Sequence, residues 1–321
     1  MKNRLFLQRF SSLFEKIVVV DTEKWRKNPL VIFKLVVTLA FVRNAKVVVS
    51  CEAMAPKVIK FLYYCRLHKE VIYWVIGCDV VRRIGERELN PKQFAYLKSI
   101  VVQSPKMVET LNSVGLHNAI YVPNSKPVYD LPEVEHLEGV TRFVFVARII
   151  PEKGCDLILN CVERLNAEGL GEKFSVDFYG KIGPGYDFES RVSVIGNVSY
   201  QSVLNLLDRA GYEEMSHYDV FLFPTYYKGE GFPGSVIDAY IAGLPIIASD
   251  WHFNKDVIKD GETGFIIPPQ DEEALYKSML SLIRDKSVLR QMRSNCLQEA
   301  KLYDVNNVLN EDVLRKVGLI G

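Results

Sequence analysis

The clearest chemical pattern in this chain lies in residues 221–250, which contain two acids eight residues apart. Glu230 lies in a Gly-rich loop after a predicted apolar strand, and a helix predicted to begin near Gly234 contains Asp238. The first N–H groups of a helix have no partner inside it, so they can face an anion. A phosphate there would leave an attached sugar alcohol near the Asp238 carboxylate, about 5–6 Å further along. The pattern therefore predicts a βαβ unit that binds a phosphate-linked sugar at the carboxyl ends of its strands.

Four sequence blocks together resemble a known family. In chain order they are IYVPNS at 120–125, VFVARIIPEKG at 144–154, FLFPTYYKGEGFPGSVIDAYIAGLPIIASD at 221–250 and DGETGFIIPPQD at 260–271. Their order and motifs resemble glycosyltransferase family 4, which has the GT-B fold. Each block alone is modest support, whereas four in register are strong. The resemblance covers residues 120–275, about half of the chain.

Two cations and one acid are the catalytic residues that the resemblance implies. Arg148 follows a predicted strand, and Lys153 comes five residues later, after a turn that contains Pro151. A guanidinium can grip phosphate oxygens at two points, and an ammonium adds a point charge. In the family, the Glu that matches Glu230 contacts hydroxyls of the donor sugar. The alternative is a solvent-facing Arg and Lys on a loop, but the helix opening and Glu230 favour a phosphate site.

The remaining donor contacts come from the same loop and from a second turn. The resemblance implies backbone contacts in the loop and ribose contacts at Asp238, which is one methylene shorter than the family's usual Glu. The stretch VSVIGNVSYQSVLNLL resembles the family's Gly-x-Val turn before a helix, which implies that Asn197 and Val198 lie beside the nucleobase, although a plain strand-turn-helix explains these residues equally well. The predicted nucleotide and donor contacts are Gly231, Phe232, Gly234, Ser235, Val236, Asp238, Gly180, Asn197 and Val198.

The acceptor side departs from the family. The family often places a His after the strand predicted here at 71–76, but Gly77, Cys78 and Asp79 occupy that position. Asp79 is an acceptor-side candidate, and an Asp that caps a turn is an equal alternative. Glu52, just after the strand predicted at 46–50, has the same standing.

Alternating apolar and helical patterns predict a parallel α/β fold. The family resemblance implies the GT-B form of this fold, with two Rossmann-like domains that face each other across a cleft. The N-terminal half has predicted strands at 17–20, 46–50, 71–76, 100–103 and 119–122, and helices at 30–42, 56–68, 91–98 and 105–114. We expect an acceptor-binding domain at 1–126, a linker at 127–139, a nucleotide-sugar-binding domain at 140–301, and a C-terminal helix within 302–321 that packs on the first domain.

Charge is unevenly divided between the halves. Residues 1–126 carry an excess of twelve positive charges and the remainder an excess of eleven negative charges, although the whole chain has a net charge of +1. Basic and aromatic residues gather in KVIKFLYYCRLHK at 57–69, which would suit an anionic membrane surface or a phosphate-linked acceptor. A solvated surface is the alternative. A nucleic-acid binder would also be basic, but no known motif supports one, so we expect no nucleic-acid partner.

Cysteine and histidine patterns predict neither a disulfide framework nor a metal site. The six cysteines form no C-x-x-C pair, which favours free thiols in a reducing cytosol. Lys2, Arg4 and Arg9 argue against a secretory signal, and Lys34 interrupts the longest apolar run, at 29–42. We therefore expect no metal and no cofactor beyond the donor itself. The expected location is the cytoplasm, with peripheral attachment to the inner face of the membrane.

The function predicted from these features is a retaining glycosyltransferase. It would move a sugar from a UDP-sugar, with a GDP-sugar as the second choice, to a glycan or lipid-linked acceptor in polysaccharide or glycoconjugate synthesis. No pair of carboxylates is spaced for the glycosidase mechanism. The alternative is a non-catalytic GT-B partner subunit or glycan-binding protein, which the missing His favours and which Arg148, Lys153 and Glu230 oppose.

Overall fold

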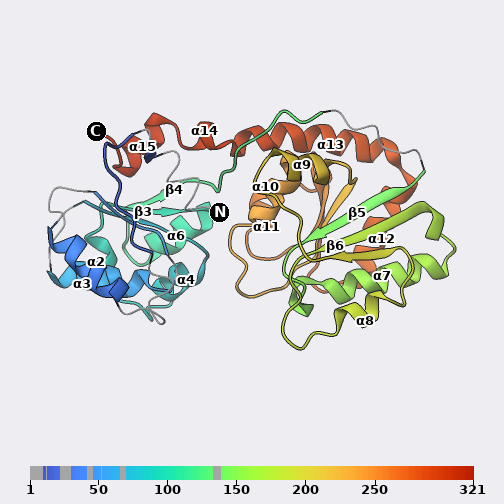
Figure 1. The fold of residues 1–321 in the computed structure, drawn as a ribbon, viewed down its shortest axis with the longest axis horizontal. Coiled ribbons are helices and arrows are strands. Elements are labelled where there is room, and N and C mark those ends of the chain that lie inside the picture. Colours follow the sequence, from blue (N-terminus) through green and yellow to red (C-terminus); the bar gives the residue numbers. More distant parts are fainter. Residues whose placement is uncertain are drawn as a thin grey trace. The chain divides into compact units, whose positions relative to one another are not determined.

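The computed structural model describes residues 10–11, 13–21, 30–41, 46–51, 53–65, 70–132 and 139–321. The chain divides into two compact units (Figure 1). Unit 1 comprises Met1–Asn124 and Val308–Gly321, and unit 2 comprises Ser125–Asn307. Each unit is built on a parallel sheet with helices, which confirms the predicted α/β class with two domains.

Unit 1 contains a four-stranded parallel sheet in the order β1-β2-β3-β4. Its central strands are buried along their whole length and are apolar apart from Ser99, as expected when helices cover both faces of a parallel sheet. The strands are β1 (Val47–Val49), β2 (Val71–Trp74), β3 (Ser99–Val102) and β4 (Ala119–Tyr121). The helices before residue 124 are α2 (Leu30–Phe41), α3 (Ala55–Cys65), α4 (Asp79–Gly85), α5 (Lys92–Ala95) and α6 (Pro105–Ser113).

One prediction for unit 1 is wrong in its local structure. Residues 17–20 form no strand, and the side chains of Ile17, Val18 and Val19 are exposed. The preference of an apolar run for a strand depends on a neighbouring strand that pairs with it and on burial of its side chains. Asp79, for which the sequence leaves an acceptor-side role and a turn-capping role open, lies in the first turn of helix α4. An acid at that position is favoured by the helix dipole.

The chain returns to unit 1 near its C-terminus. Helix α15 (Glu311–Val317) is held there by Ser99, whose buried hydroxyl donates to the carbonyl of Val317 at 2.7 Å. The Lys46 ammonium donates to the Gly318 carbonyl at 2.8 Å. Residues 302–307, which the sequence assigned to the C-terminal segment, belong to unit 2 instead.

Unit 2 is a six-stranded parallel sheet in the order β10-β9-β8-β5-β6-β7. The chain starts in the middle at β5, moves outward through β6 and β7, and then returns to the other side of β5 with β8. Its strands are β5 (Thr141–Val146), β6 (Phe174–Tyr179), β7 (Val198–Gln201), β8 (Val220–Phe223), β9 (Ile246–Ser249) and β10 (Gly264–Ile267). This reversal of strand order lies between the adjacent strands β5 and β8.

Helices cover both faces of the unit 2 sheet (Figure 1). Phe143 and Phe145 of β5 point into a core shared with α7 and α12, whereas Val144 points into a second core shared with α9 and α10. The helices are η1 (Pro151–Lys153), α7 (Cys155–Ala167), η2 (Gly171–Lys173), α8 (Phe188–Val192), α9 (Arg209–Ser216), α10 (Gly234–Ile241), α11 (Asn254–Val257), α12 (Glu272–Arg284), α13 (Lys286–Ala300), η3 (Lys301–Tyr303) and α14 (Val305–Val308).

No helix in the described part of the chain is both long enough and apolar enough to cross a bilayer. Helix α2, within the longest apolar run, has twelve residues. It is not buried as a core helix would be, because Leu30 and Phe33 are 70% and 68% exposed.

One glycine permits the close approach of the loops that follow β5 and β8. Gly154 has a φ of 81°, and a Cβ at this position would lie 2.3 Å from the carbonyl oxygen of Pro224. Gly185 has a similar φ of 74°, yet a Cβ there would meet nothing within 4 Å. A comparison of substitutions at the two glycines therefore separates the cost of the left-handed backbone from the cost of overlap with Pro224.

We predict that Gly154→Ala destabilises the protein more than Gly185→Ala. Both variants bear the left-handed backbone penalty of about 1–2 kcal/mol, and Gly154→Ala adds an overpacking cost of about 1–3 kcal/mol. Thermal unfolding of the two variants measures the difference. Equal melting temperatures would show that the loops can separate without cost.

Candidate functional site

The residues with the strongest predicted chemistry meet where the strand order of unit 2 reverses. In open α/β sheets, ligands bind at the carboxyl ends of strands at such a switch point. The loop after β5 carries Arg148 and Lys153, and the loop after β8 carries Glu230. Because β5 and β8 are hydrogen-bonded neighbours, their loops emerge side by side.

Backbone contacts hold these two loops together. The N–H of Tyr226 donates to the carbonyl of Glu152 at 2.8 Å, and the Thr225 hydroxyl contacts the same carbonyl at 3.4 Å. The third neighbour, β9, adds Ser249, whose hydroxyl donates to the carbonyl of Thr225. The ends of three strands are thereby connected into one surface.

Lys153 and Glu230 form an ion pair at the centre of this surface. Their side chains are only 9% and 14% exposed. The hydroxyl of Thr225 lies 3.2 Å from Oε2 of Glu230, the same oxygen that Lys153 contacts. A pair this poorly hydrated is costly unless both charges stay partnered, so an anion that takes Lys153 must leave Glu230 another partner.

Both predicted phosphate-binding cations contact the same aromatic ring. The Arg148 guanidinium is 4.9 Å from the centre of the Tyr227 ring, and the Lys153 ammonium is 5.4 Å from the same centre. Such cation–π contacts orient a side chain without neutralising its charge. The indole of Trp251 donates to the carbonyl of Tyr227 at 2.8 Å, which fixes the loop beneath the ring.

Sequence reasoning missed Thr225, Tyr227 and Trp251. Thr225 and Tyr227 lie between the end of β8 and Glu230, and Trp251 lies just after β9. The available signal was therefore position, because residues directly after neighbouring parallel strands must line the same edge.

The start of helix α10 contributes the predicted anion-binding backbone. Pro233 is the N-cap residue, and Gly234 and Ser235 are the first two residues of the helix. The sequence predicts that the N–H groups of Ser235 and Val236 face a phosphate, but this is wrong for Val236, because its N–H donates to the carbonyl of Pro233 at 3.1 Å and so already has a partner. Phe232 is buried, whereas Gly231 is partly exposed. Gly231, Phe232 and the start of α10 thus follow Glu230 directly in the sequence.

Asp238 lies in the interior and already has two partners. Its Oδ1 accepts a hydrogen bond from the Tyr212 hydroxyl at 2.6 Å and forms an ion pair with the Lys126 ammonium. Burial, reinforced by the negative charge of Asp238, raises the pKa of Tyr212. The phenol therefore stays protonated and remains a donor. The ribose contact implied by the family resemblance stays a prediction, and the structure adds two partners that the sequence did not suggest.

The predicted nucleobase residues are divided between two edges of the sheet. Gly180 follows β6 at its carboxyl end and has a φ of 148°, which lets its backbone pass the carbonyl of Ala147. Asn197 precedes β7, and Val198 pairs with Val176 near the start of β6. At about 3.3 Å per residue, Val198 lies roughly 13 Å from the edge that Gly180 occupies.

Asn197 has a local structural role at the opposite edge. Its side-chain amide donates to Asn166 at 2.7 Å, and its φ of 65° turns the chain into β7. The grouping of Asn197 and Val198 with Gly180 is therefore corrected, because the first two residues lead into a parallel strand and the glycine follows one. Ser202 and Val203, directly after β7, lie at the carboxyl edge instead.

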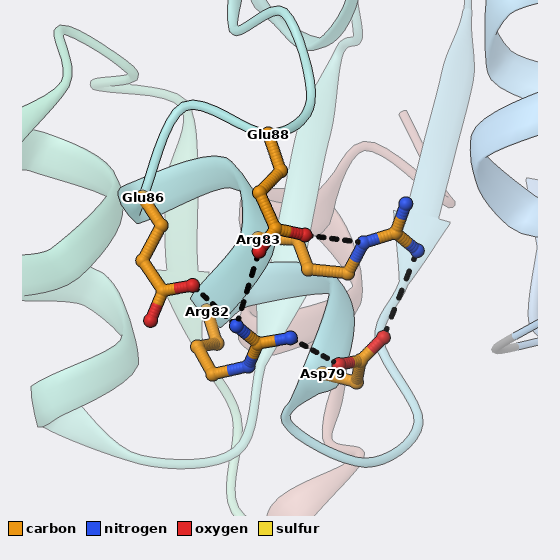
Figure 2. A network of polar contacts seen from close by, with 5 residues as sticks. All are labelled: Asp79, Arg82, Arg83, Glu86 and Glu88. Atoms are coloured by element: carbon orange, nitrogen blue, oxygen red, sulfur yellow. Dashed lines mark hydrogen bonds and ion pairs between the residues drawn. The ribbon is translucent and has the colours of Figure 1, made fainter.

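Asp79 belongs to a polar network on helix α4 (Figure 2). Arg82 donates to Asp79 at 2.8 Å and also pairs with Glu86, while Arg83 donates to Glu88 at 3.1 Å. These side chains are 35–52% exposed, so each single ion pair adds little stability. An acceptor role for Asp79 stays a prediction, with its carboxylate held by arginines. The other candidate, Glu52, lies outside the described residues.

The site offers fixed cations and helix-end N–H groups for phosphate, together with a carboxylate for a sugar hydroxyl. Across the described ranges, no three His, Cys, Asp or Glu side chains gather as a metal site. The predicted absence of a metal requirement stays a prediction, to be tested by binding.

Comparisons with known proteins agree with this geometry. A family model described as Glycosyl transferases group 1 matches residues 131–302. The phosphatidyl-myo-inositol mannosyltransferase of Mycobacterium leprae (strain TN) is 30% identical over 200 residues, covering 60% of this chain and 52% of that protein. The 2-deoxystreptamine N-acetyl-D-glucosaminyltransferase of Niallia circulans is 26% identical over 219 residues, covering 64% and 51%. The chain thus spans about half the length of these relatives.

A solved structure extends the comparison to both units. Anabaena Alr3699/HepE in complex with UDP and glucose is similar with a TM-score of 0.69 and 12% identity, covering 95% of this chain and 84% of that chain. At this identity the likeness concerns the fold, and it confirms the predicted GT-B fold.

We predict that Lys153→Met destabilises the protein by about 3 kcal/mol, because it breaks an ion pair that is poorly hydrated on both sides. Lys153→Met/Glu230→Gln should recover most of this loss. Lys277→Met is the matched control, because Lys277 pairs with Glu273 in the open and should cost at most about 1 kcal/mol. Chemical unfolding measures the free energy of unfolding of each variant. An equal loss in Lys153→Met and Lys277→Met would contradict the assignment of Lys153 and Glu230 as a poorly hydrated ion pair.

Proposed function

The chain belongs to the family of glycosyl transferases group 1, and from this premise we propose that it transfers a hexose from a nucleoside diphosphate sugar with retention of anomeric configuration. UDP-sugars are the first choice of donor and GDP-sugars the second. The acceptor is a glycan or a lipid-linked sugar in polysaccharide or glycoconjugate synthesis. The observation that carries this proposal is the meeting of Arg148, Lys153 and Glu230 at the switch point of the unit 2 sheet.

Each of the three side chains has a distinct task in this proposal. Arg148, exposed and oriented by Tyr227, grips oxygens of the pyrophosphate. Lys153 supplies a point charge to the phosphate that departs, where negative charge develops during transfer. Glu230 accepts hydrogen bonds from hydroxyls of the donor sugar. The departing phosphate takes the proton of the acceptor hydroxyl on the same face, and the new glycosidic bond forms there.

The ion pair prepares both partners for the donor. Before binding, Lys153 and Glu230 neutralise each other in a poorly hydrated place. When the donor enters, a phosphate oxygen becomes the new partner of the ammonium, and a sugar hydroxyl becomes a partner of the carboxylate. Neither charge is left without a partner, so the exchange avoids the cost of a lone buried ion.

We predict that UDP binds without a divalent metal and that Arg148→Ala weakens binding at least about tenfold. A charge-assisted hydrogen bond to phosphate contributes about 1.5–3 kcal/mol, which corresponds to that factor. Titration calorimetry in the presence of a chelator measures both effects. Arg290→Ala, an exposed change on α13 of the same unit, is the matched control and should bind like the wild type.

Turnover of radiolabelled UDP-hexoses then tests the enzyme itself. Transfer or slow hydrolysis is expected in the wild type and should fall at least about tenfold in Arg148→Ala and Lys153→Ala. Binding that requires Mg²⁺ would overturn the metal-free cradle. Tight binding of UDP without any turnover would support the alternative of a non-catalytic, glycan-binding partner.

We propose in addition that unit 1 attaches peripherally to an anionic membrane, where it meets a lipid-linked acceptor. Apolar Leu30 and Phe33 of helix α2 are exposed, as is Tyr64 of α3. Lys57 and Lys60, also on α3, are exposed, and Lys60 lies one helical turn before Tyr64. Exposed apolar groups with nearby cations are the combination that interfacial attachment requires.

We predict that the protein co-sediments with vesicles containing anionic lipid, but not with neutral vesicles, and that high salt releases it. Each Lys near such a surface contributes about 1 kcal/mol, so Lys57→Glu/Lys60→Glu should weaken binding more than tenfold. Lys92→Glu/Lys106→Glu is the control, because it makes the same charge change at exposed sites on α5 and α6. Equal binding to neutral and anionic vesicles would contradict this attachment.

A further inference from the structure

The chain passes between the two units twice, and the two passages are joined on the unit 2 side. It leaves unit 1 after Asn124 and returns at Val308. The N–H of Lys126 donates to the carbonyl of Tyr303 at 3.0 Å, and the N–H of Val305 donates back to the carbonyl of Lys126 at 3.0 Å. This pairing defines the crossing segments, 126–128 and 303–305.

The crossing segments also contact helix α10 and the loop before it. We call this loop, residues 224–233 between β8 and α10, the donor loop. The Lys126 ammonium pairs with Asp238 in the middle of α10, and the two side chains are 10% and 8% exposed. The Tyr303 ring lies 6.2 Å from the ring of Phe232, in the donor loop, and 6.3 Å from the ring of Tyr240, in α10. The first crossing segment thus holds α10 through an ion pair, and the second holds it through aromatic packing.

The Tyr212 hydroxyl completes the arrangement around Asp238. It shares the carboxylate oxygen Oδ1 with Lys126, and its ring lies 5.4 Å from that of Tyr129, just after the first crossing segment. A buried carboxylate with one cation and one hydroxyl is stable only while both stay in place. The position of α10 therefore depends on Lys126, a residue far from it in sequence.

We propose that Lys126 is a positioning residue for the nucleotide site and that it acts through Asp238. It rests on the proposed function, because the site in question is the donor site at the start of α10. Helix α10 supplies the N–H groups of Gly234 and Ser235 and continues the loop that holds Glu230. A displacement of about 1 Å at groups that hold a substrate can reduce the rate about a hundredfold. Lys126 controls that placement without touching the nucleotide.

A purely structural ion pair would have a different effect. Its loss would lower the melting temperature and the folded fraction, while the folded molecules would bind UDP as before. A positioning role changes the dissociation constant and KM of the folded molecules themselves. Calorimetric stoichiometry gives the folded, binding-competent fraction, so the two effects are measured separately.

The experiment compares Lys126→Met, Lys126→Arg, Asp238→Asn and Lys126→Met/Asp238→Asn in UDP titrations, with Lys277→Met as the exposed control. We expect about tenfold or greater weakening in Lys126→Met, partial recovery in Lys126→Arg, and no weakening in the control. Because Lys126 acts through Asp238, the double variant should lose much less affinity than the product of the two single losses.

The outcomes separate this proposal from the function on which it rests. Failure of the wild type to bind UDP or GDP would overturn the proposed function. If the wild type binds and Lys126→Met binds equally well, only the positioning role is wrong. Losses that multiply in the double variant would also overturn it, because they would show that Lys126 and Asp238 act independently. Should Lys126→Met fail to fold, Lys126→Arg and the double variant still provide the comparison.

Discussion

The ion pair between Lys153 and Glu230 is the interaction on which the rest of the site depends. It joins the loop after β5 to the loop after β8, and the sheet places those loops side by side because its strand order reverses there. Gly154 allows the loops to approach, and Tyr227 orients Arg148 beside the pair. In this poorly hydrated place, one substrate can replace both partners of the pair: a phosphate can replace Glu230 at Lys153, and sugar hydroxyls can replace Lys153 at Glu230.

The donor loop is held by helix α10 and the crossing segments as well as by the sheet. Helix α10 starts at this loop, and its middle is held by the Lys126–Asp238 pair, while Tyr303 packs on Phe232. The residues that would contact a nucleotide thus share one helix with the residues that receive the two crossing segments. This connection gives unit 2 a route by which changes in the crossing segments could alter nucleotide binding, and it uses only packed side chains and one buried charge pair.

Local sequence predicted the strands that are buried on both faces, together with the residues that follow them. Arg148, Lys153 and Glu230 come together because carboxyl ends of adjacent parallel strands share an edge. The same rule explains the error at Asn197, which precedes its strand. Residues 17–20 have a strand-like composition but no paired strand among those described. The partnership of Lys126 with Asp238 joins segments that are distant in sequence, so no local pattern could have predicted it.

Binding of a nucleoside diphosphate where β5 and β8 end is the proposal on which the other roles depend. Hydrogen exchange, followed by mass spectrometry with and without UDP, tests this claim directly because it reports backbone protection along the whole chain. We predict protection on UDP binding in residues 148–154 and 226–236, with little change at the start of β7 around Asn197. Protection confined to unit 1, or to the polar cavity lined by Arg142, Asp177 and His217, would contradict it.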